Sequence, residues 1–181
     1  MLKIGILLGD DIGLEVVPEC VKVIKAAAAK TGLRIGWQEL PIGKRGHELH
    51  GHTMPQSTVD ALAKTDGWVC GPIGHNAYPR NDPTWVMPPL RKKFELFANV
   101  KPVKSYANIP SVHKDVDIVF LRETTEGMMS GSVVLAGSGE FQPNEDIAIG
   151  MRVVTRKGAS RVAREAFEIA RTRKRKLVTA L

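Results

Sequence analysis

The sequence has no hydrophobic run long enough to span a bilayer, although 43% of its 181 residues are hydrophobic. It has only two cysteines, Cys20 and Cys70, and their spacing is not typical of a disulfide framework or a metal site. The N-terminus leads directly into a strand-like segment, without the basic and apolar zones of a signal peptide. These absences argue against membrane insertion and export, and they predict a cytoplasmic protein.

The sequence carries a formal net charge of +7. Part of the excess lies in the run R-T-R-K-R-K at 171–176, which follows a segment of helical periodicity and is typical of a solvated helix end. The other basic residues are not interleaved with the aromatic side chains of a single-strand nucleic-acid binder. The distribution therefore favours small anionic ligands over nucleic acid.

Strand and helix patterns alternate along the N-terminal part of the chain. Apolar or alternating segments at 3–8, 34–40 and 67–70 predict strands. Helical spacing of apolar residues predicts helices over 14–29 and 53–64. This order is typical of a parallel sheet flanked by helices, so the sequence predicts an α/β fold.

The glycines of G-D-D-I-G at 9–13 follow the first predicted strand but lack the three-glycine dinucleotide fingerprint. Their alternative use is a sharp turn that presents Asp10 and Asp11 at the carboxyl edge of the sheet, where open α/β folds place ligands. Farther along, the segment 71–89 has too many prolines and glycines for a helix or a central strand, and it is predicted to be a long loop.

A polar segment, L-R-E-T-T-E-G-M-M-S-G at 121–131, follows an apolar run at 116–120. The run predicts a buried strand, and charged groups at the rigid end of a strand are a common place for a ligand site. A surface turn with a solvated Arg-Glu pair is the alternative. The residues alone leave both interpretations open.

Three segments together resemble the isocitrate/isopropylmalate dehydrogenase family. They are G-D-D-I-G-L-E-V-V at 9–17, L-R-K-K-F-E-L-F-A-N-V-K-P-V-K at 90–104 and L-R-E-T-T-E-G at 121–127, in the family's order and spacing. The resemblance implies an isopropylmalate dehydrogenase-like α/β fold, with a parallel-rich sheet flanked by helices and part of a smaller α/β domain. It assigns residues 1–104 to the N-terminal part of the large domain and 105–181 to part of the small, dimer-forming domain.

Members of this family are usually homodimeric β-decarboxylating dehydrogenases that oxidise 2-hydroxy acids bearing a further carboxylate. They use NAD or NADP and a divalent cation, Mg or Mn. The metal ion stabilises developing negative charge, and a general acid protonates the enolate left after loss of carbon dioxide. The resemblance therefore implies a small carboxylic acid as substrate, and either a homodimer or a complementing subunit.

By the same resemblance, the cations that hold the substrate carboxylates fall on Arg91, on Lys101 where arginine is usual, and on Arg122. The planar fork of arginine meets a carboxylate with two parallel hydrogen bonds, whereas lysine offers a point charge. The lysine at 101 is therefore expected to weaken or reshape that contact.

The resemblance also places the nicotinamide end of the cofactor beside the loop that contains Gly71, Pro72 and Thr84. Met129 stands where the family usually has the tyrosine that supplies the proton, and a thioether cannot donate one. The family's catalytic lysine and metal-binding aspartates would fall beyond residue 181. The resemblance thus assigns no catalytic residue and no metal ligand to this chain.

Two functions remain open. One is an NAD(P)-dependent dehydrogenase and decarboxylase of 2-hydroxy di- or tricarboxylic acids, with these 181 residues inactive on their own. The other is a non-catalytic regulatory or anion-binding subunit, or a relic, which Met129 and Lys101 favour. The sequence does not choose among hydroxy acids, nor between NAD and NADP.

Overall fold

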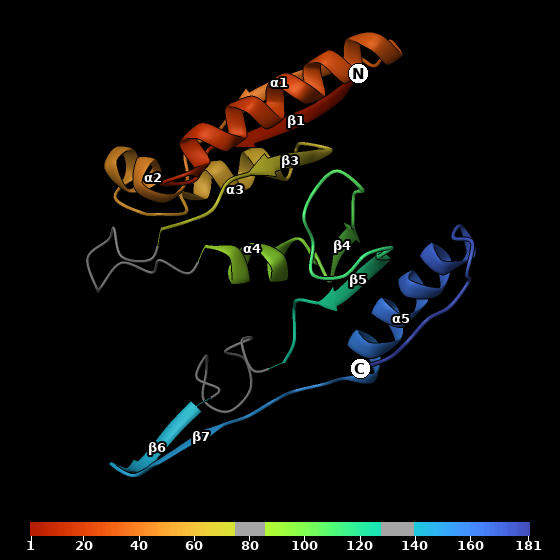
Figure 1. Ribbon diagram of the computed structural model, residues 1–181. Helices are drawn as coiled ribbons and strands as arrows, with labels where there is room; N and C mark the ends of the chain where they lie inside the picture. The colour runs from red at the N-terminus through yellow and green to blue at the C-terminus, as the bar shows by residue number, and fades with distance from the viewer. Residues whose placement is uncertain (75–85, 128–139) are drawn as a thin grey trace. The chain divides into compact units, whose positions relative to one another are not determined.

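The computed structural model describes residues 1–74, 86–127 and 140–181 (Figure 1). The chain divides into two compact units, Met1–Met87 and Pro88–Leu181. None of the helices in the described ranges is long and apolar enough to cross a membrane.

The first unit is built on a three-stranded parallel sheet. Its strands are β1 (Leu2–Leu7), β2 (Ile35–Glu39) and β3 (Gly67–Cys70), in the spatial order β2-β1-β3. Ile4 at the centre of β1 is opposite Trp37 on one side and Gly67 on the other. The predicted parallel α/β sheet is confirmed, and each strand bound differs from the predicted one by at most one residue.

Helices α1 (Gly13–Thr31), α2 (Gly43–His50) and α3 (Gln56–Leu62) accompany this sheet. Helix α1 ends at Gly32, whose φ of 72° is the left-handed conformation that glycine adopts without strain. Helix α2 was not predicted, because its sequence G-K-R-G-H-E-L-H carries two glycines and no apolar stripe. The buried apolar core of this unit includes Leu7, Val17, Val21, Ile42, Val59 and Leu62.

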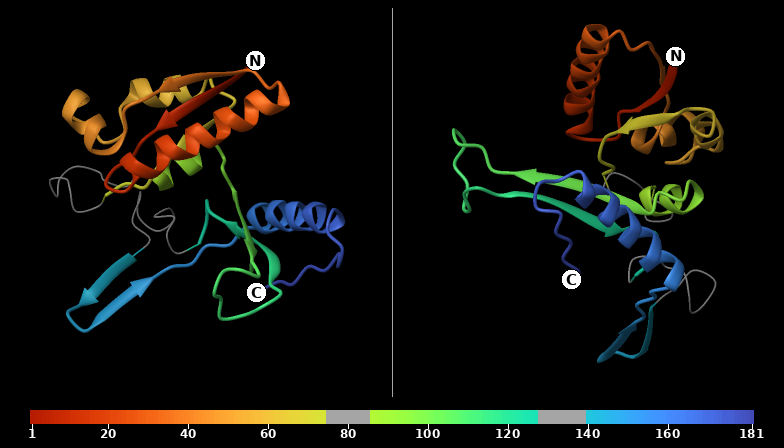
Figure 2. Two further views of the ribbon diagram at one scale, coloured as in Figure 1. Left: turned by 45° about the horizontal axis from the view of Figure 1, so that its top comes forward. Right: turned by 90° about the vertical axis from the view of Figure 1, so that its right-hand side faces the viewer.

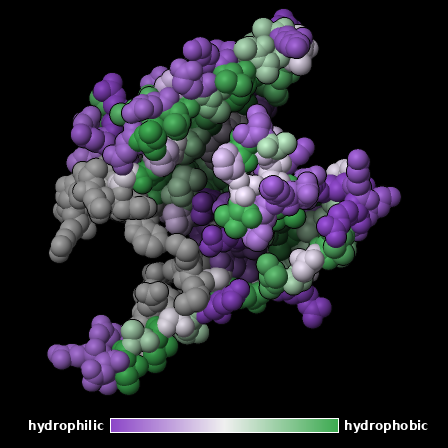
Figure 3. Space-filling view, in the orientation of Figure 1, coloured by the Kyte–Doolittle hydropathy of each residue, from purple (hydrophilic) through white to green (hydrophobic). Residues whose placement is uncertain are grey.

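The second unit contains two separate antiparallel strand pairs and a long helix. After α4 (Met87–Lys93), strand β4 (Ala98–Lys104) pairs with β5 (Asp117–Glu123), and β6 (Glu140–Asn144) pairs with β7 (Ile147–Gly150). Helix α5 (Arg156–Arg171) lies against β5, and both views of Figure 2 show the β6–β7 hairpin standing apart from these elements. Apolar surface is visible on that hairpin (Figure 3), where Ile147 and Ile149 are exposed.

Strand β5 is not the buried strand that its apolar run predicted. Ile118 is 42% exposed and Phe120 is 48% exposed, whereas Val119 and Leu121 are half-buried. Because α5 covers only one face of β5, alternate residues of the strand are left at the surface. The prediction was wrong because an apolar run reports composition, not how many neighbouring elements cover a strand.

The compact units divide earlier than the predicted domain boundary at residue 104. Strand β4 pairs along its whole length with β5, from Ala98 opposite Glu123 to Lys104 opposite Asp117, and so it belongs to the second unit. The assignment of 1–104 and 105–181 to a large and a small domain of a whole family member stays a prediction.

Candidate functional site

The pairing of β4 with β5 brings two of the predicted substrate-binding residues together. Asn99 is opposite Arg122, and Lys101 is opposite Phe120. Directly paired residues of an antiparallel ribbon share a face, as do residues two apart on one strand, so Lys101 and Arg122 are diagonal neighbours about 7–8 Å apart. We call this face of the ribbon the outer face; it carries Asn99, Lys101, Val103, Ile118, Phe120 and Arg122.

Arg91, the third predicted cation, lies in the same unit, in the last turn of α4. Its backbone C=O accepts a hydrogen bond of 2.8 Å from the N–H of Leu96, which ties the end of this helix to the segment entering β4. Its side chain is half-buried. The structure thus connects Arg91 to the start of β4, where Asn99 and Lys101 follow along the strand.

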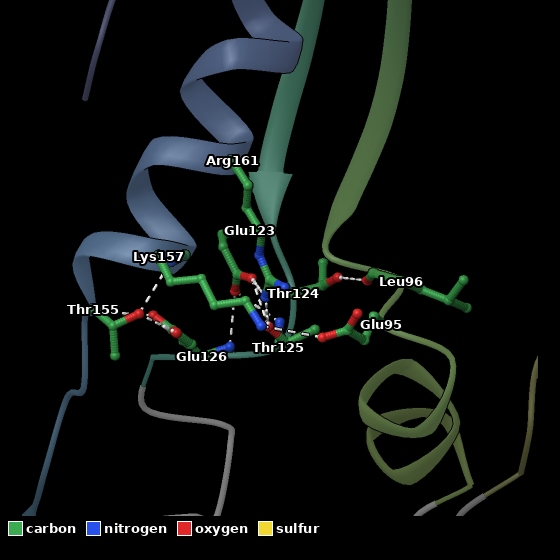
Figure 4. A network of polar contacts seen from close by, with 10 residues as sticks. Glu95, Leu96, Glu123, Thr124, Thr125, Glu126, Thr155, Lys157 and Arg161 are labelled. Atoms are coloured by element: carbon green, nitrogen blue, oxygen red, sulfur yellow. Dashed lines mark hydrogen bonds and ion pairs between the residues drawn. The ribbon is translucent and has the colours of Figure 1, made fainter.

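The acidic and hydroxyl residues of the L-R-E-T-T-E-G segment have a different use from Arg122. The Glu123 carboxylate accepts hydrogen bonds from the N–H of Thr125 (2.7 Å), the hydroxyl of Thr125 (2.6 Å) and the N–H of Glu126 (2.8 Å). Thr124 donates its N–H to the C=O of Phe97 and its hydroxyl to the C=O of Leu96. Figure 4 shows these groups converging where β5 ends. The turn is therefore satisfied internally.

Arg161 of α5 completes this network. Its Nη2 donates to Glu123 Oε1 at 2.8 Å and to the hydroxyl of Thr125 (Figure 4). Its guanidinium also lies 4.8 Å from the centre of the Phe97 ring. The side chains of Arg161 and Glu123 are only 19% and 17% exposed. Ion pairs of this kind are screened less by solvent than exposed ones.

The pKa of Glu123 lies below its usual value. Burial alone would raise it, but the hydrogen bonds from the Thr125 hydroxyl, Arg161 and the backbone N–H groups of Glu126 and Thr125 outweigh that effect. Glu123 is therefore an ionised structural acceptor at neutral pH, and its charge is matched by Arg161 on the side that faces α5.

Glu126 and Thr155 join the same turn to the start of α5. The Glu126 carboxylate accepts from the N–H of Thr155 at 2.9 Å and from its hydroxyl at 2.5 Å. The Thr155 hydroxyl in turn accepts from the N–H of Gly158 at 3.0 Å, which is the N-cap bond of the helix. A carboxylate beside a helix N-terminus also opposes the positive end of its dipole.

In the first unit, a buried carboxylate organises the carboxyl edge of the sheet. Asp10 is 4% exposed, and its two oxygens accept N–H bonds from Lys44 at 2.7 Å and Gly74 at 2.9 Å. Its own N–H donates to the C=O of Pro72 at 2.8 Å. The predicted turn at 9–13 is thus a junction that ties the end of β1 to the start of α2 and the segment after β3.

Gly71 and Pro72, which were predicted to bind the cofactor, take part in this junction. The N–H of Gly71 donates to the C=O of Leu7 at 2.8 Å, and a Cβ at 71 would clash with the C=O oxygen of Leu8. These contacts are with the chain itself, and the role of both residues in cofactor binding stays a prediction. Thr84 and Met129, the other two predicted positions, lie outside the described residues.

Metal-ligand groups and the thiol of Cys70 are the other candidates for a site in the described residues. Across 1–74, 86–127 and 140–181, no three His, Cys, Asp or Glu side chains are grouped as metal ligands. Burial raises the pKa of the Cys70 thiol to about 11, so it stays protonated at neutral pH. Cys70 is therefore not a nucleophile at neutral pH, and Cys20, the other cysteine, is exposed.

The family resemblance named Arg91, Lys101 and Arg122, but neither it nor the residue patterns gave a role to Arg161, to Thr155 or to Glu123. The sequence carries one usable signal, a threonine directly before a helical segment, which is typical of an N-cap. It carries none for the pairing of Arg161 with Glu123, which are 38 residues apart.

The family model described as isocitrate/isopropylmalate dehydrogenase matches residues 3–181. The chain is 33% identical to the 3-isopropylmalate/3-methylmalate dehydrogenase of Methanocaldococcus jannaschii, over 97% of this chain and 47% of that relative. It is 34% identical to the 3-isopropylmalate dehydrogenase of Salmonella typhimurium, over 97% of this chain and 51% of that relative. A crystal structure of isocitrate dehydrogenase from Methylococcus capsulatus superimposes with a TM-score of 0.76 and 32% identity, over 95% of this chain and 48% of that one.

The chain thus spans about half the length of the curated relatives it matches. The match with a solved structure covers elements of both compact units, and it agrees with the predicted isopropylmalate dehydrogenase-like α/β fold. The family match extends over nearly the whole chain, and the chain belongs to the isocitrate/isopropylmalate dehydrogenase family.

Proposed function

We propose that the outer face of the β4–β5 ribbon binds the carboxylates of a small hydroxy acid. The observation that carries this proposal is the strand register, which places Lys101 and Arg122 as diagonal neighbours on one face. Glu123, the acidic residue next to Arg122, faces α5 instead, where Arg161 neutralises it. The residues that make up the outer face therefore include two cations and no acidic side chain.

A polycarboxylate suits this arrangement better than a monocarboxylate. Two cations on neighbouring strands can each hold one carboxylate, and charge-assisted hydrogen bonds contribute about 1.5–3 kcal/mol each. Arg122 would form the bidentate contact and Lys101 the single one. Arg91 would add a third contact from the end of α4, next to the segment that leads into β4.

For the whole protein we propose an NAD(P)-dependent oxidative decarboxylase of a 2-hydroxy di- or tricarboxylic acid, similar to isopropylmalate or isocitrate. Family membership and the names of the relatives support it. NAD or NADP and Mg or Mn would be the cofactors, with Gly71, Pro72 and Thr84 near the nicotinamide. A homodimer or a complementing subunit in the cytoplasm belongs to the same proposal.

In this proposal the residues of this chain bind and orient the substrate rather than move its protons. If Met129 occupies the position of the family's tyrosine, it cannot protonate an enolate. The described residues also contain no group of metal ligands. These 181 residues on their own are therefore expected to bind a substrate-like acid without reducing NAD or NADP.

Calorimetry with 3-isopropylmalate and with isocitrate tests the binding site. Arg122→Ala and Lys101→Ala should each weaken binding at least tenfold, since each removes one charge-assisted contact. Lys104→Ala is the matched control, because Lys104 is on the same strand but pairs with Asp117 on the face that α5 covers. Equal affinities for wild type, R122A and K101A would overturn the site, and robust NAD or NADP reduction by the purified chain would overturn its inactivity.

A non-catalytic anion-binding or regulatory subunit is the second candidate. It is favoured by a face with two cations in a chain whose described residues hold no group of metal ligands. Sequencing the reading frame beyond codon 181 separates the two. An in-frame continuation that supplies a lysine and paired aspartates supports the dehydrogenase, whereas a stop codon supports the subunit.

A further inference from the structure

We propose that Arg161 is a positioning residue for the anion site, which it fixes from the opposite face of the β4–β5 ribbon. The inference rests on the proposed binding role of Lys101 and Arg122. Arg161 does not touch the outer face; it acts through Glu123 and the turn that follows it.

The first argument is the place where Arg161 makes contact. Glu123 follows Arg122 directly, and successive residues of a strand point to opposite faces, so holding Glu123 fixes the backbone that carries Arg122. Phe97, whose ring lies under the Arg161 guanidinium, directly precedes Ala98, and Ala98 is opposite Glu123. Arg161 therefore contacts the last residue of β5 and the residue that directly precedes β4, at the end of the ribbon where Arg122 lies.

The second argument is that a two-stranded ribbon does not hold its own geometry. Isolated two-stranded pairs are marginally stable in water, and the packing of α5 against β5 is the main support of this one in the described residues. A pair of cations binds its ligand less tightly when the two groups are misplaced by about 1 Å. In enzymes, a misplacement of this size lowers the reaction rate up to roughly 100-fold. A rigid end of the ribbon is thus a condition for a tight diagonal site.

The third argument is a contrast along the same helix. Arg173, just beyond the other end of α5, donates to the C=O of Asp117 at 2.9 Å and to its carboxylate at 2.6 Å. The two contacts lie about 18 Å apart along a helix and roughly 20 Å apart along a strand, so α5 is held to both ends of β5. The Arg173 pair is far more exposed, with side chains 32% and 63% accessible, and it lies at the end of β5 away from Arg122.

The contacts made at position 161 require an arginine and not merely a positive charge. One guanidinium bridges two acceptors, Glu123 and Thr125, and its carbon lies over the Phe97 ring. A lysine would keep the charge but would not reproduce the planar bridge or the stacking. Replacement by lysine should therefore fail to restore the site, which separates positioning from simple charge neutralisation.

The experiment compares R161K and R161Q with R173Q, the matched loss of an Arg-carboxylate contact to the same strand. Calorimetry measures the affinity for 3-isopropylmalate, and amide hydrogen exchange measures the order of the N–H groups of Thr125 and Glu126. Both Arg161 variants should bind about tenfold more weakly and exchange faster at these two amides. R173Q should bind as wild type does and leave both amides unchanged.

The outcomes separate the two proposals. Wild-type affinity in R161K or R161Q, or unchanged exchange at Thr125 and Glu126, would overturn the positioning role even if R122A abolishes binding. If the wild-type chain does not bind 3-isopropylmalate or isocitrate, the proposed function fails, and the exchange rates still decide whether Arg161 orders this end of the ribbon. If R161Q does not fold, Thr125→Val removes the hydroxyl that contacts both Arg161 and Glu123 but keeps the direct Arg161–Glu123 ion pair, and the same two measurements apply.

Discussion

A Cβ at Gly158 would clash with Oε2 of Glu126, the carboxylate that binds Thr155 at the start of α5. The backbone of the first helical turn and this side chain are thus in direct contact. A glycine inside a helix normally lowers stability by about 1 kcal/mol relative to alanine. The close approach of Glu126 explains why this position holds a glycine, since any larger residue would clash with the carboxylate.

Gly158→Ala should destabilise the chain despite its better helix propensity. The added methyl group must displace Glu126 and weaken its hydrogen bonds to Thr155, and overpacking of this kind costs about 1–3 kcal/mol. Urea unfolding measures the change, with Ser160→Ala, at an exposed position of the same helix, as the control. A G158A protein more stable than wild type would contradict this prediction, because it would show that the Glu126 side chain can move aside without losing its hydrogen bonds to Thr155.

Asp10→Ala should lower the free energy of unfolding by about 3 kcal/mol. The change leaves the N–H groups of Lys44 and Gly74 without their carboxylate, and hydrogen bonds to a charged group contribute about 1.5–3 kcal/mol each. Asp11→Ala is the neighbouring control, since Asp11 is exposed. Thermal unfolding of both variants checks the difference, and equal midpoints would contradict the role of Asp10 as a junction.

The stability difference between wild type and Glu123→Gln should depend on pH. The pKa of Glu123 is lowered in the folded chain from a usual value of 4.5, so its ionised form contributes stability above that pH. This contribution is lost as the pH falls through the folded-state pKa, where the carboxyl becomes protonated. Urea unfolding from pH 7 to pH 3 should show the two proteins converging at the acid end, and a constant difference would contradict the assignment.

Glu95→Gly should stabilise the end of α4. Glu95 has a φ of 48°, and the N–H of Leu96 donates to the C=O of Arg91, the pattern in which a helix usually ends on glycine. Relief of the left-handed conformation should gain about 1 kcal/mol, more than the loss of the exposed pair with Lys157, whose side chains are 75% and 70% accessible. Glu95→Gln removes the charge but keeps the conformation, and it should bring no gain in the melting temperature.

The sequence predicts most of the regular elements because their signals are local. Apolar periodicity places α1, and alternation places β2, without knowledge of any other segment. The outward exposure of Phe120 and the contact of Arg161 with Glu123 depend on which distant segments meet. Local sequence patterns do not report which distant segments are in contact, so these two features were seen only in the structure.

The candidate site could likewise be predicted only in part: its residues were named from the sequence, but their arrangement was not. Family resemblance named Lys101 and Arg122, but only the pairing of Asn99 with Arg122 and of Lys101 with Phe120 shows that they share a face. The resemblance also directed attention to the whole L-R-E-T-T-E-G segment, whereas its glutamates and threonines serve the attachment of α5. Alternation of side chains within one strand explains how a single motif serves both purposes.

The register of β4 with β5 also determines which genetic changes the candidate site tolerates. A slip of one residue between the strands would turn Lys101 and Arg122 to opposite faces, although both residues would still be present. A slip of two would keep the shared face but change their separation along the ribbon. Single-residue insertions or deletions within either strand should therefore be more harmful than most substitutions there, while changes of length in the loop at 105–116 that leave the pairing intact should be tolerated.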